Sequence, residues 1–448
     1  MEEFTNKRLA VVGMARSGLA AAEVLTARGA SVTLYDGKPA DELASPLAWA
    51  ADHGIPARAA TNRVDDCDIV VTSPGVRRTA AVLTDAVERG IPVWGEIEAA
   101  YRIARAPILA ITGTNGKTTT TALLGAMTEA AGYETYLAGN IAAGEIAMPL
   151  IRAAHKANHD AVIIAEISSF QLEWAPTFRP KVAAILNIAV DHADRQTWDE
   201  YVAAKWNIFE NQGEGDTAVL RSDVPLVGDR IRGWDADAPS IHSPGKTTII
   251  QFDRVRPQPE WVNRLLIPGA HNIENAMAAF AMATAFGIPS DAIEKAATTF
   301  AGVVHRLEYV ATIGGARYIN NSMCTNNVAF ERSLDAIPGP KIVLAGGVYK
   351  GGDMADLLDA ATQSSVKRLV LFGKSGPDLE AAVRARGFER AVRVDDIAQA
   401  VNSAHALASD GDTVMLSPAC ASFDQFRDFE DRGDTFKRLV HALSGATG

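Results

Sequence analysis

Short apolar runs alternate with longer segments of helical periodicity along the chain, and this alternation predicts an α/β protein. The short runs are rich in Val, Ile and Leu, as buried parallel strands are. The longer segments are rich in Ala and Leu, and glycine follows several of them. We expect strands at Arg8–Val12, Ser31–Tyr35, Asp68–Thr72, Ile108–Thr112, Ala161–Ile167, Val182–Ile188, Ala316–Ile319, Lys341–Leu344, Leu369–Leu371 and Thr413–Leu416. We expect helices at Ser17–Arg28, Thr118–Ala131, Asp199–Asn211 and Asn272–Gly287.

The chain is longer than one ordinary domain, and its length and candidate linkers suggest three domains. With 448 residues, size scaling favours about three domains. A linker is expected at Arg105–Pro107, because Pro107 precedes a new strand, and a third unit begins near Val303. We predict three α/β domains: a Rossmann-like N-terminal domain at 1–104, a P-loop-type ATPase domain at 105–302 and a Rossmann-like C-terminal domain at 303–448. The polar, turn-rich stretch Gly213–Glu260 is expected to form peripheral β structure.

Composition narrows the class of protein. A hydrophobic content of 48% with 22% charged residues is typical of a soluble globular chain. The net charge of -11 argues against sequence-independent binding of nucleic acid, which needs clustered cations. Three scattered cysteines are too few for a disulfide framework or a four-thiolate zinc site. No apolar run of about 20 residues and no signal peptide are evident, so we expect a cytoplasmic protein without a nucleic-acid or membrane partner.

A glycine-rich loop joins the strand Ile108–Thr112 to the helix that follows it. The loop reads Gly113-Thr114-Asn115-Gly116-Lys117, followed by Thr118 and Thr119. Glycines let backbone N–H groups approach phosphate oxygens, the helix N-terminus adds partial positive charge, and Lys117 adds a full charge. Ile111 stands where the strict P-loop has glycine, so this is a variant. A glycine turn with a surface lysine is the plainer interpretation, but the strand–loop–helix context favours phosphate binding.

Polar residues follow two further strands, where a metal ion would complete a nucleotide site. Glu166 ends one strand, and Asp191-His192 follows the next. The carboxyl ends of parallel strands meet at one edge of a sheet, so Glu166, His192 and Thr118 are expected in one crevice. Mg²⁺ prefers such oxygen ligands. Taken alone, His192 would be a capping or surface histidine, and Lys205 a solvated helix lysine; only the strand-end position favours a role for His192.

The first glycine loop does not fit a nicotinamide cofactor. It reads Gly13-Met14-Ala15-Arg16-Ser17-Gly18 and lacks the middle glycine of the dinucleotide fingerprint. The N-terminus of the following helix can still hold a pyrophosphate, with Arg16 assisting.

Eight sequence blocks together resemble the Mur ligase family of peptidoglycan synthesis, over essentially the whole chain. The blocks are GTNGKTT (113–119), GN (139–140), EISSFQLE (166–173), NIAVDHADR (187–195), AAKWNIFEN (203–211), GAHNIENAMAA (269–279), HRLE (305–308) and SPACASFDQFRDFEDRG (417–433). The last block is typical of the glutamate-adding branch. The resemblance implies ATP-dependent ligation of D-glutamate to UDP-N-acetylmuramoyl-L-alanine through an acyl phosphate. We expect the protein to be a monomer, although the sequence itself does not reveal the oligomeric state. It also implies two Mg²⁺ ions, one of them bound through a carbamylated Lys205.

The resemblance assigns roles to individual residues. Those implied to contact ATP are Gly113, Thr114, Asn115, Gly116, Lys117, Thr118, Thr119, Asn275, Arg306 and Asn321. Those implied to bind metal are Thr118, Glu166, His192 and Lys205, and Lys117, His192 and Lys205 are the implied catalytic residues. The UDP-linked substrate is expected at Ser17, Gly18, Asp36, Ser73, Gly75, Asn140 and Ser168, and the amino acid at Thr325, Lys350, Ser422 and Phe429.

Three positions depart from the family pattern and keep alternatives open. Asn321 and Met323 stand where the family pattern N-D-S-K-A-T-N has aspartate and lysine, and Tyr349 stands where aspartate is frequent. Losing both charges together leaves no unpaired charge if the two pair in relatives. A different acceptor such as L-glutamate, a folylpolyglutamate-type ligase and a non-catalytic UDP-sugar-binding paralogue are the alternatives. The complete N-terminal domain argues against the second, and retention of Lys117, Glu166, His192 and Lys205 argues against the third.

Overall fold

The α/β prediction is confirmed by a computed structural model of the chain, which contains three largely parallel sheets with flanking helices. The model describes residues 3–140, 148–189, 196–222, 241–242, 247–253, 257–267, 269–325, 327–349, 355–362 and 365–445. The chain divides into two compact units, the first formed by 1–265 and 270–300 and the second by 266–269 and 301–448. The predicted domain boundaries stay predictions, although each predicted domain contains one sheet.

The first sheet is wholly parallel, with the strand order β3-β2-β1-β4-β5. Its strands are β1 Arg8–Val12, β2 Ser31–Tyr35, β3 Ala57–Arg58, β4 Ile69–Thr72 and β5 Val93–Gly95. The helices that follow them are α1 Arg16–Ala27, α2 Ala44–Asp52, α3 Ala81–Glu88 and α4 Glu96–Ile103. Apolar side chains of β1 and β4 alternate between two buried clusters, one on each face, as a sheet covered on both sides requires.

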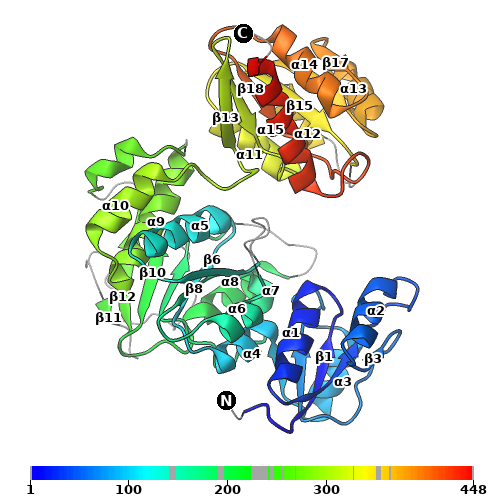
Figure 1. Cartoon of the computed structure of the whole chain (residues 1–448), viewed down its shortest axis with the longest axis vertical. Coiled ribbons are helices and arrows are strands. Elements are labelled where there is room, and N and C mark those ends of the chain that lie inside the picture. The colour runs from blue at the N-terminus through cyan, green and yellow to red at the C-terminus, as the bar shows by residue number, and fades with distance from the viewer. Residues whose placement is uncertain are drawn as a thin grey trace. The chain divides into compact units, whose positions relative to one another are not determined.

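The second sheet has seven strands in the order β11-β12-β10-β9-β6-β8-β7, and all pairs except β11–β12 are parallel. The strands are β6 Ile108–Thr112, β7 Thr135–Gly139, β8 Val162–Glu166, β9 Val182–Ile185, β10 Thr217–Arg221, β11 Ile241–His242 and β12 Thr248–Phe252. The helices are α5 Lys117–Ala130, α6 Leu150–Lys156, α7 Ser169–Leu172, α8 Trp198–Trp206, α9 Ala270–Phe286 and α10 Ser290–Thr299, with 3₁₀ helices η2 Asn207–Phe209 and η4 Glu260–Arg264. Helices α5, α9 and α10 pack together on this sheet (Figure 1).

The stretch predicted as peripheral β structure, Gly213–Glu260, contributes three strands to the second sheet. Strand β10 pairs with β9 in parallel and continues the central sheet, and β12 then pairs with β10. Val219 of β10 is fully buried against α9, which explains why a turn-rich segment still forms sheet. Strands β11, β12 and β10 lie together at one edge of the sheet, as predicted for this stretch, whereas the pairing of β10 with β9 was not evident from its few apolar residues.

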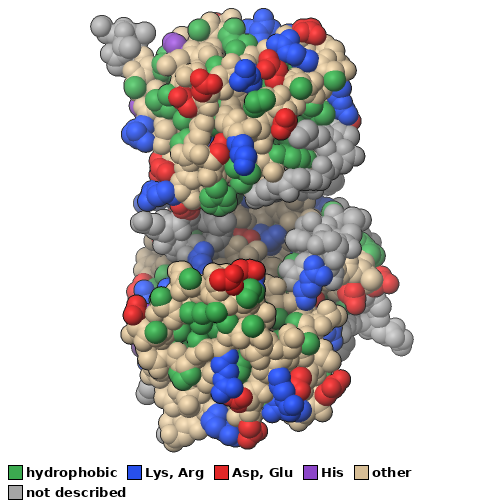
Figure 2. Space-filling model, turned by 90° about the vertical axis from the view of Figure 1, so that its right-hand side faces the viewer, with side chains coloured by type: hydrophobic (Ala, Val, Ile, Leu, Met, Phe, Trp, Pro, Cys, Tyr) green, Lys and Arg blue, Asp and Glu red, His purple; other side chains and the backbone are tan. Residues whose placement is uncertain are grey.

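The third sheet belongs to the second unit and has the order β13-β14-β18-β15-β16-β17, with only the β13–β14 pair antiparallel. Its strands are β13 Glu308–Ile313, β14 Ala316–Asn320, β15 Lys341–Gly346, β16 Val366–Phe372, β17 Ala391–Arg393 and β18 Thr413–Leu416. The helices are α11 Asn327–Ala336, α12 Ala355–Ala361, α13 Gly376–Ala385, α14 Ile397–Leu407 and α15 Phe429–Gly445. On the face shown in Figure 2, acidic and basic side chains are interspersed over both units.

One buried carboxylate joins the first sheet's helices to the second's. Glu96 begins α4, is 2% exposed, and its Oε1 accepts a hydrogen bond from the Ile151 backbone N–H at 2.7 Å, in the first turn of α6. Burial raises the pKa of Glu96 from 4.5 to about 7, against the opposing effects of that hydrogen bond and of the Arg16 charge. The apolar core is continuous here, from α1 and α4 to α6 and β8.

Replacing Glu96 with Gln is expected to remove a pH-dependent loss of stability. Because the pKa of Glu96 is raised in the folded state, its contribution to the free energy of unfolding is fully present below pH 4.5. That contribution is lost as pH rises through 7. The pKa shift corresponds to a loss of about 3 kcal/mol in the free energy of unfolding at pH 8. Glu96→Gln should recover this stability, because the amide stays uncharged and keeps an acceptor for the Ile151 N–H. Chemical denaturation at pH 5 and pH 8 measures this. Glu88→Gln, on the exposed end of α3, is the control, and an unchanged pH dependence in Glu96→Gln would refute the assignment.

Candidate functional site

The glycine loop after β6 has the form of a phosphate cradle, held in place by the end of β9. Thr114 N–H donates to Asn187 O at 2.9 Å, Asn115 N–H donates to Asn187 Oδ1 at 2.9 Å, and Asn187 Nδ2 donates back to Asn115 O at 3.0 Å. The loop is therefore fixed before any ligand arrives. Gly116 is the residue just before α5 and has φ +83°, and a β-carbon there would lie 2.1 Å from the Asn275 side-chain oxygen. Both the backbone conformation and the contact with α9 thus require glycine.

Two lysines converge on the same loop carbonyl. Lys117 Nζ donates to Gly113 O and Thr114 O, each at 3.0 Å, so its charge lies folded over the loop. Lys205, on α8, is 2% exposed, and its Nζ donates to Gly113 O at 2.9 Å. The Lys205 ammonium also lies 4.5 Å from the centre of the Tyr201 ring, whose hydroxyl is 2.9 Å from Thr114 Oγ1. Lys205 therefore packs against the loop. Spacing alone had suggested a solvated helix lysine, and this expectation is wrong.

Thr118 and Glu166 lie in direct contact, as the metal-site prediction requires. Thr118 Oγ1 donates to Glu166 Oε2 at 2.8 Å, and both residues are buried. Strands β6 and β8 are neighbours, which places the end of β8 beside the loop. His192 lies outside the described residues, so its place stays a prediction. Within the part of the chain that is described, no three His, Cys, Asp or Glu residues group closely enough to hold a metal by themselves.

Asn140 and Ser168 lie at the same edge of the second sheet as Glu166. The Asn140 backbone N–H donates to Glu166 O at 2.8 Å, and its exposed side chain is left available at the end of β7. Ser168 caps α7, with its Oγ accepting from the Gln171 backbone N–H while the Gln171 side chain accepts from the Ser168 N–H. Thr119 is buried in the first turn of α5, beside Thr118.

The first sheet gathers its predicted substrate residues at its own carboxyl edge. Asp36 Oδ2 accepts from the Met14 N–H at 2.9 Å, and Ser73 Oγ donates to Gly13 O at 3.1 Å. A β-carbon at Gly18 would lie 1.8 Å from Gly13 O, so the loop closes tightly onto the start of α1. Ser17 lies in the first turn of α1 next to Gly18, and Gly75 follows Ser73 in the loop after β4. All five residues therefore lie on adjacent segments, and their contact with a ligand stays a prediction.

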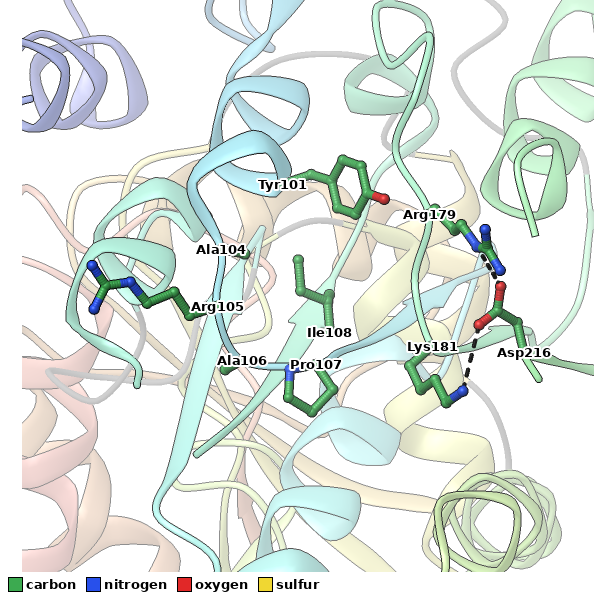
Figure 3. A pocket seen from close by; sticks show the side chains of 9 residues that line it. All are labelled: Tyr101, Ala104, Arg105, Ala106, Pro107, Ile108, Arg179, Lys181 and Asp216. Atoms are coloured by element: carbon green, nitrogen blue, oxygen red, sulfur yellow. Dashed lines mark hydrogen bonds and ion pairs between the residues drawn. The ribbon is translucent and has the colours of Figure 1, made fainter. Parts of the chain in front are cut away.

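A cavity lies at the opposite edge of the second sheet, away from the phosphate loop. It measures about 440 Å³ and lies at the amino ends of β6, β9 and β10 (Figure 3). Three of its charged residues pair with one another, since Arg179 Nε donates to Asp216 Oδ2 at 2.6 Å and Lys181 Nζ lies 3.7 Å from Asp216 Oδ1. We interpret this trio as a clamp between the loops that precede β9 and β10.

The second unit brings together loops from three neighbouring strands, β14, β18 and β15. Val348 and Ala421 exchange backbone hydrogen bonds of 2.8 and 2.9 Å, so the chain after β15 runs beside Ser422. Asn321 donates from Nδ2 to Ser417 Oγ at 3.2 Å and accepts from the Leu307 N–H at 3.2 Å. Its amide is thus committed to internal contacts next to Arg306. Lys350 lies outside the described residues, and Thr325, Ser422 and Phe429 lie on these loops or at the start of α15.

A buried arginine, which the sequence did not single out, ties these loops together. Arg432 is fully buried, and its guanidinium donates to Ser322 Oγ (3.0 Å), Ser322 O (2.9 Å) and Cys420 O (3.1 Å). Ser322 Oγ in turn donates to Phe429 O at 2.6 Å. Burial lowers the pKa of Arg432 to about 10, which leaves it cationic at neutral pH. Arg432 lies within the block SPACASFDQFRDFEDRG, which the sequence analysis identified, but the sequence did not reveal that its side chain is buried.

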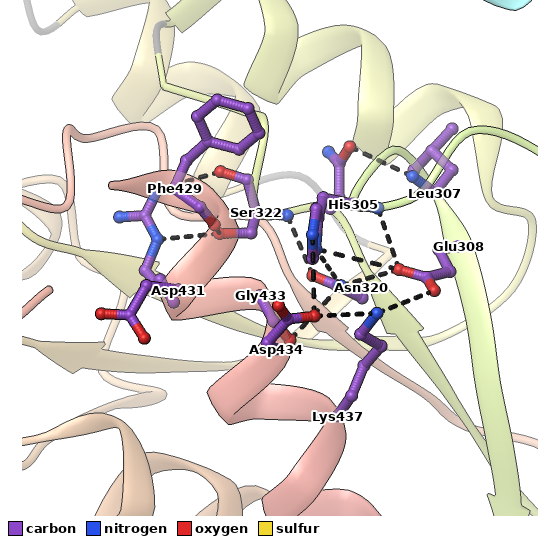
Figure 4. A network of polar contacts seen from close by, with 12 residues as sticks. His305, Leu307, Glu308, Asn320, Ser322, Phe429, Asp431, Gly433, Asp434 and Lys437 are labelled. Atoms are coloured by element: carbon purple, nitrogen blue, oxygen red, sulfur yellow. Dashed lines mark hydrogen bonds and ion pairs between the residues drawn. The ribbon is translucent and has the colours of Figure 1, made fainter. Parts of the chain in front are cut away.

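Beside Arg432, a polar cluster surrounds His305 (Figure 4). Asn320 Nδ2 lies 3.0 Å from His305 Nδ1 and 2.9 Å from Glu308 Oε2, and Lys437 Nζ lies 3.3 Å from Glu308 Oε1. Burial lowers the pKa of His305, and the Lys437 charge adds to this, against Glu308 and other nearby carboxylates. A neutral His305, packed edge-on against the Phe429 ring, therefore helps to fix the start of α15.

Comparisons with known proteins find relatives along the whole chain. Three family models match the chain: the Mur ligase MurD-like N-terminal domain at 7–95, the Mur ligase middle domain at 111–283, and the Mur ligase glutamate ligase domain at 305–420. The UDP-N-acetylmuramoylalanine--D-glutamate ligase of Pelotomaculum thermopropionicum is 42% identical, over 99% of each chain. The enzyme of the same name from Bacillus thuringiensis strain Al Hakam is 38% identical, over 98% of this chain and 99% of its own.

Solved structures show the same fold at much lower identity. UDP-N-acetylmuramate-alanine ligase from Thermotoga maritima matches with a TM-score of 0.55 and 17% identity, covering 98% of this chain and 100% of its own. The bifunctional folylpolyglutamate synthase/dihydrofolate synthase from Yersinia pestis matches with a TM-score of 0.53 and 18% identity, but covers only 78% of this chain and 91% of its own. In the described residues no helix is long and apolar enough to cross a membrane. With matches along its whole length, at identities well above 30%, this chain belongs to the Mur ligase family.

Proposed function

We propose that this protein ligates D-glutamate to UDP-N-acetylmuramoyl-L-alanine at the expense of ATP, in the synthesis of peptidoglycan precursors. The observation that carries the proposal is full-length similarity, at 42% identity, to a ligase whose name states this reaction. The match to a MurD-like N-terminal domain at 7–95 disfavours a folylpolyglutamate-type ligase, whose solved relative covers only part of the chain. Because the proposed reaction consumes ATP, we infer that the protein acts in the cytoplasm. We infer that it acts as a monomer, which gel filtration would test.

The ATP phosphates are assigned to the cradle between β6 and α5. The N–H groups at the start of α5 and the glycines of the loop favour negative charge there. Lys117 already lies over the loop, within 3.0 Å of two carbonyl oxygens, and a phosphate is a stronger partner for it than a neutral carbonyl. Asn275, against Gly116, is placed to contact the nucleotide from α9.

The residues beside the cradle fit Mg²⁺. A hydroxyl and a carboxylate oxygen, from Thr118 and Glu166, meet at 2.8 Å, and hard oxygen donors of this kind are the ligands that Mg²⁺ takes. Thr118, Glu166 and His192 would hold one ion, and a carbamylated Lys205 a second. Bound there, Mg²⁺ would neutralise the charge on the phosphates. The chain itself contributes a buried, preorganised wall, since Thr114, Asn187 and Tyr201 already fix the loop.

The proposed chemistry proceeds in two steps. The alanyl carboxylate attacks the γ-phosphorus of ATP, forming a carboxyl–phosphate bond while the bond to ADP breaks. The amine of glutamate then attacks the acyl carbon, loses a proton and displaces inorganic phosphate. Lys117 balances negative charge in the first step, and this charge balance together with positioning is what phosphoryl transfer asks of a protein. Neither step needs a nucleophilic side chain, so the buried Cys324 and Cys420 are assigned to packing.

The amino acid is assigned to the loops of the second unit. Thr325, Ser422 and Phe429 lie on loops that Arg432 and the Val348–Ala421 pair hold together, and Lys350 follows two residues after Val348. A lysine and hydroxyl groups suit the carboxylates of glutamate. We assign Asn321 to loop anchoring in addition to its proposed nucleotide contact, because its amide bridges Leu307 and Ser417.

Phosphate release with ATP, Mg²⁺ and UDP-N-acetylmuramoyl-L-alanine, measured across a panel of amino acids, tests the proposal. We expect release with D-glutamate and little with L-glutamate or other amino acids. A preference for L-glutamate would overturn the acceptor assignment alone. Absence of release with every amino acid, from folded protein that still binds the UDP-substrate, would favour the non-catalytic paralogue.

A further inference from the structure

A cavity of about 270 Å³ opens in the first unit between the loop after β4 and the helices α7 and α8. One wall carries Arg77 and Arg78, which precede α3. The other wall includes Phe170 together with Ala203 and Ala204 of α8, which give it an apolar floor. A cavity with one cationic wall and an apolar floor suits a ligand that has both a charged and an uncharged part.

The two arginines lie on the solvent-exposed wall of the cavity. Both are exposed, and in the described part of the chain neither guanidinium has a carboxylate oxygen within 4.0 Å. Arg78 lies 5.6 Å from the centre of the Trp174 ring, which orients its guanidinium without cancelling its charge.

The carboxylates of the opposite wall are committed elsewhere. Glu173 accepts a hydrogen bond from Gln196, and Glu200 closes a capping box with Thr197 at the start of α8. The Thr197 hydrogen bonds lower the pKa of Glu200, and the charge of Arg78 contributes further in the same direction. The cavity is thus lined by two arginines and two carboxylates, and the carboxylates already accept hydrogen bonds from neutral groups of their own wall.

This cavity adjoins the predicted pyrophosphate loop of the first sheet. A β-carbon at Gly13 would lie 3.0 Å from a Val76 methyl group, so Val76, next to Arg77, packs directly on that loop. The arginine on the loop itself, Arg16, lies near the buried Glu96 and stabilises its charge. Arg16 thus acts on a buried carboxylate, whereas Arg77 and Arg78 are exposed and, in the described residues, have no carboxylate oxygen within 4.0 Å.

We propose that Arg77 and Arg78 bind the diphosphate of the UDP-linked substrate, with its sugar resting on the floor formed by Phe170 and α8. The inference rests on the proposed function for the identity of the substrate. It assigns to these arginines the recognition of charge, whereas the Gly13–Gly18 loop supplies backbone N–H groups. They are substrate-positioning residues and take no part in the chemistry.

Calorimetric titration with UDP and with uridine, using the whole chain, tests this without requiring turnover. We expect Arg77→Ala and Arg78→Ala each to raise the Kd for UDP about tenfold, and Arg78→Lys to raise it less, while uridine binding changes little. Arg58→Ala is the matched control, because Arg58 is paired with Asp65 in the same domain. Equal Kd values for UDP in the wild type and in the Arg77→Ala/Arg78→Ala double variant, with unchanged melting temperature, would overturn the proposal.

Steady-state kinetics then separates this inference from the proposed function. With UDP-N-acetylmuramoyl-L-alanine as the varied substrate, the loss in the arginine variants should fall on KM rather than on kcat. An arginine-dependent Kd for UDP in a protein that never turns over would uphold the diphosphate site and overturn the ligase. Turnover with arginine-independent KM and Kd would do the reverse.

Discussion

Replacing Lys117 with alanine is expected to lower ATP-dependent turnover by about a thousandfold or more. In the proposed reaction this ammonium balances charge that develops on the transferred phosphoryl group, and no other side chain of the loop 113–116 carries a positive charge. The fold should tolerate the change, because the Lys117 side chain is partly exposed and its Nζ donates hydrogen bonds to two carbonyl oxygens of the loop. Phosphate release under saturating substrates measures the effect, and thermal unfolding checks the fold.

A matched control for Lys117 is available on another helix. Lys295 lies on the exposed face of α10, in the same unit, and Lys295→Ala removes the same charge far from the loop in sequence. Its turnover should match that of the wild type. If Lys117→Ala retained more than about a tenth of the wild-type rate, the phosphate-binding role of this loop would have to be abandoned.

Much of the framework was predictable because its signals are local. Strands β1, β2, β6 and β18 begin and end at the predicted residues, each being a short apolar run bounded by polar residues or glycine. The proximity of Thr118 and Glu166 was also predicted from the sequence. Residues that follow neighbouring parallel strands lie at the same edge of the sheet.

Residues that act through long-range contacts were not predictable in the same way. Asn187 and Tyr201 hold the phosphate loop, but their partners, Asn115 and Thr114, lie more than 70 positions earlier in the chain. Arg432 looks like an ordinary charged residue at the start of a helix, and only the packing of α15 reveals that it is buried. Burial and pairing depend on tertiary structure, which periodicity does not report.

The second large effect is expected at Lys205, where two roles are separable. Lys205 Nζ donates to Gly113 O at 2.9 Å, so the lysine anchors the phosphate loop whether or not it is modified. A carbamate nitrogen keeps one hydrogen for that carbonyl and adds a carboxylate that suits Mg²⁺. Carbamylation requires the neutral form of the Lys205 amine.

Lys205→Ala is therefore expected to lose at least about a hundredfold in turnover, and added bicarbonate should not restore it. Lys205→Arg distinguishes the two roles, because a guanidinium can still donate to Gly113 O but cannot form a carbamate. If the carbamate matters, the arginine variant should be as inactive as the alanine variant, and wild-type protein should lose activity when depleted of carbon dioxide and regain it with bicarbonate. A carbamate carbon signal after exposure to ¹³C-bicarbonate should appear in the wild type and be absent from Lys205→Arg. Full activity of Lys205→Arg would instead reduce Lys205 to a loop anchor, and the second Mg²⁺ would then need another ligand.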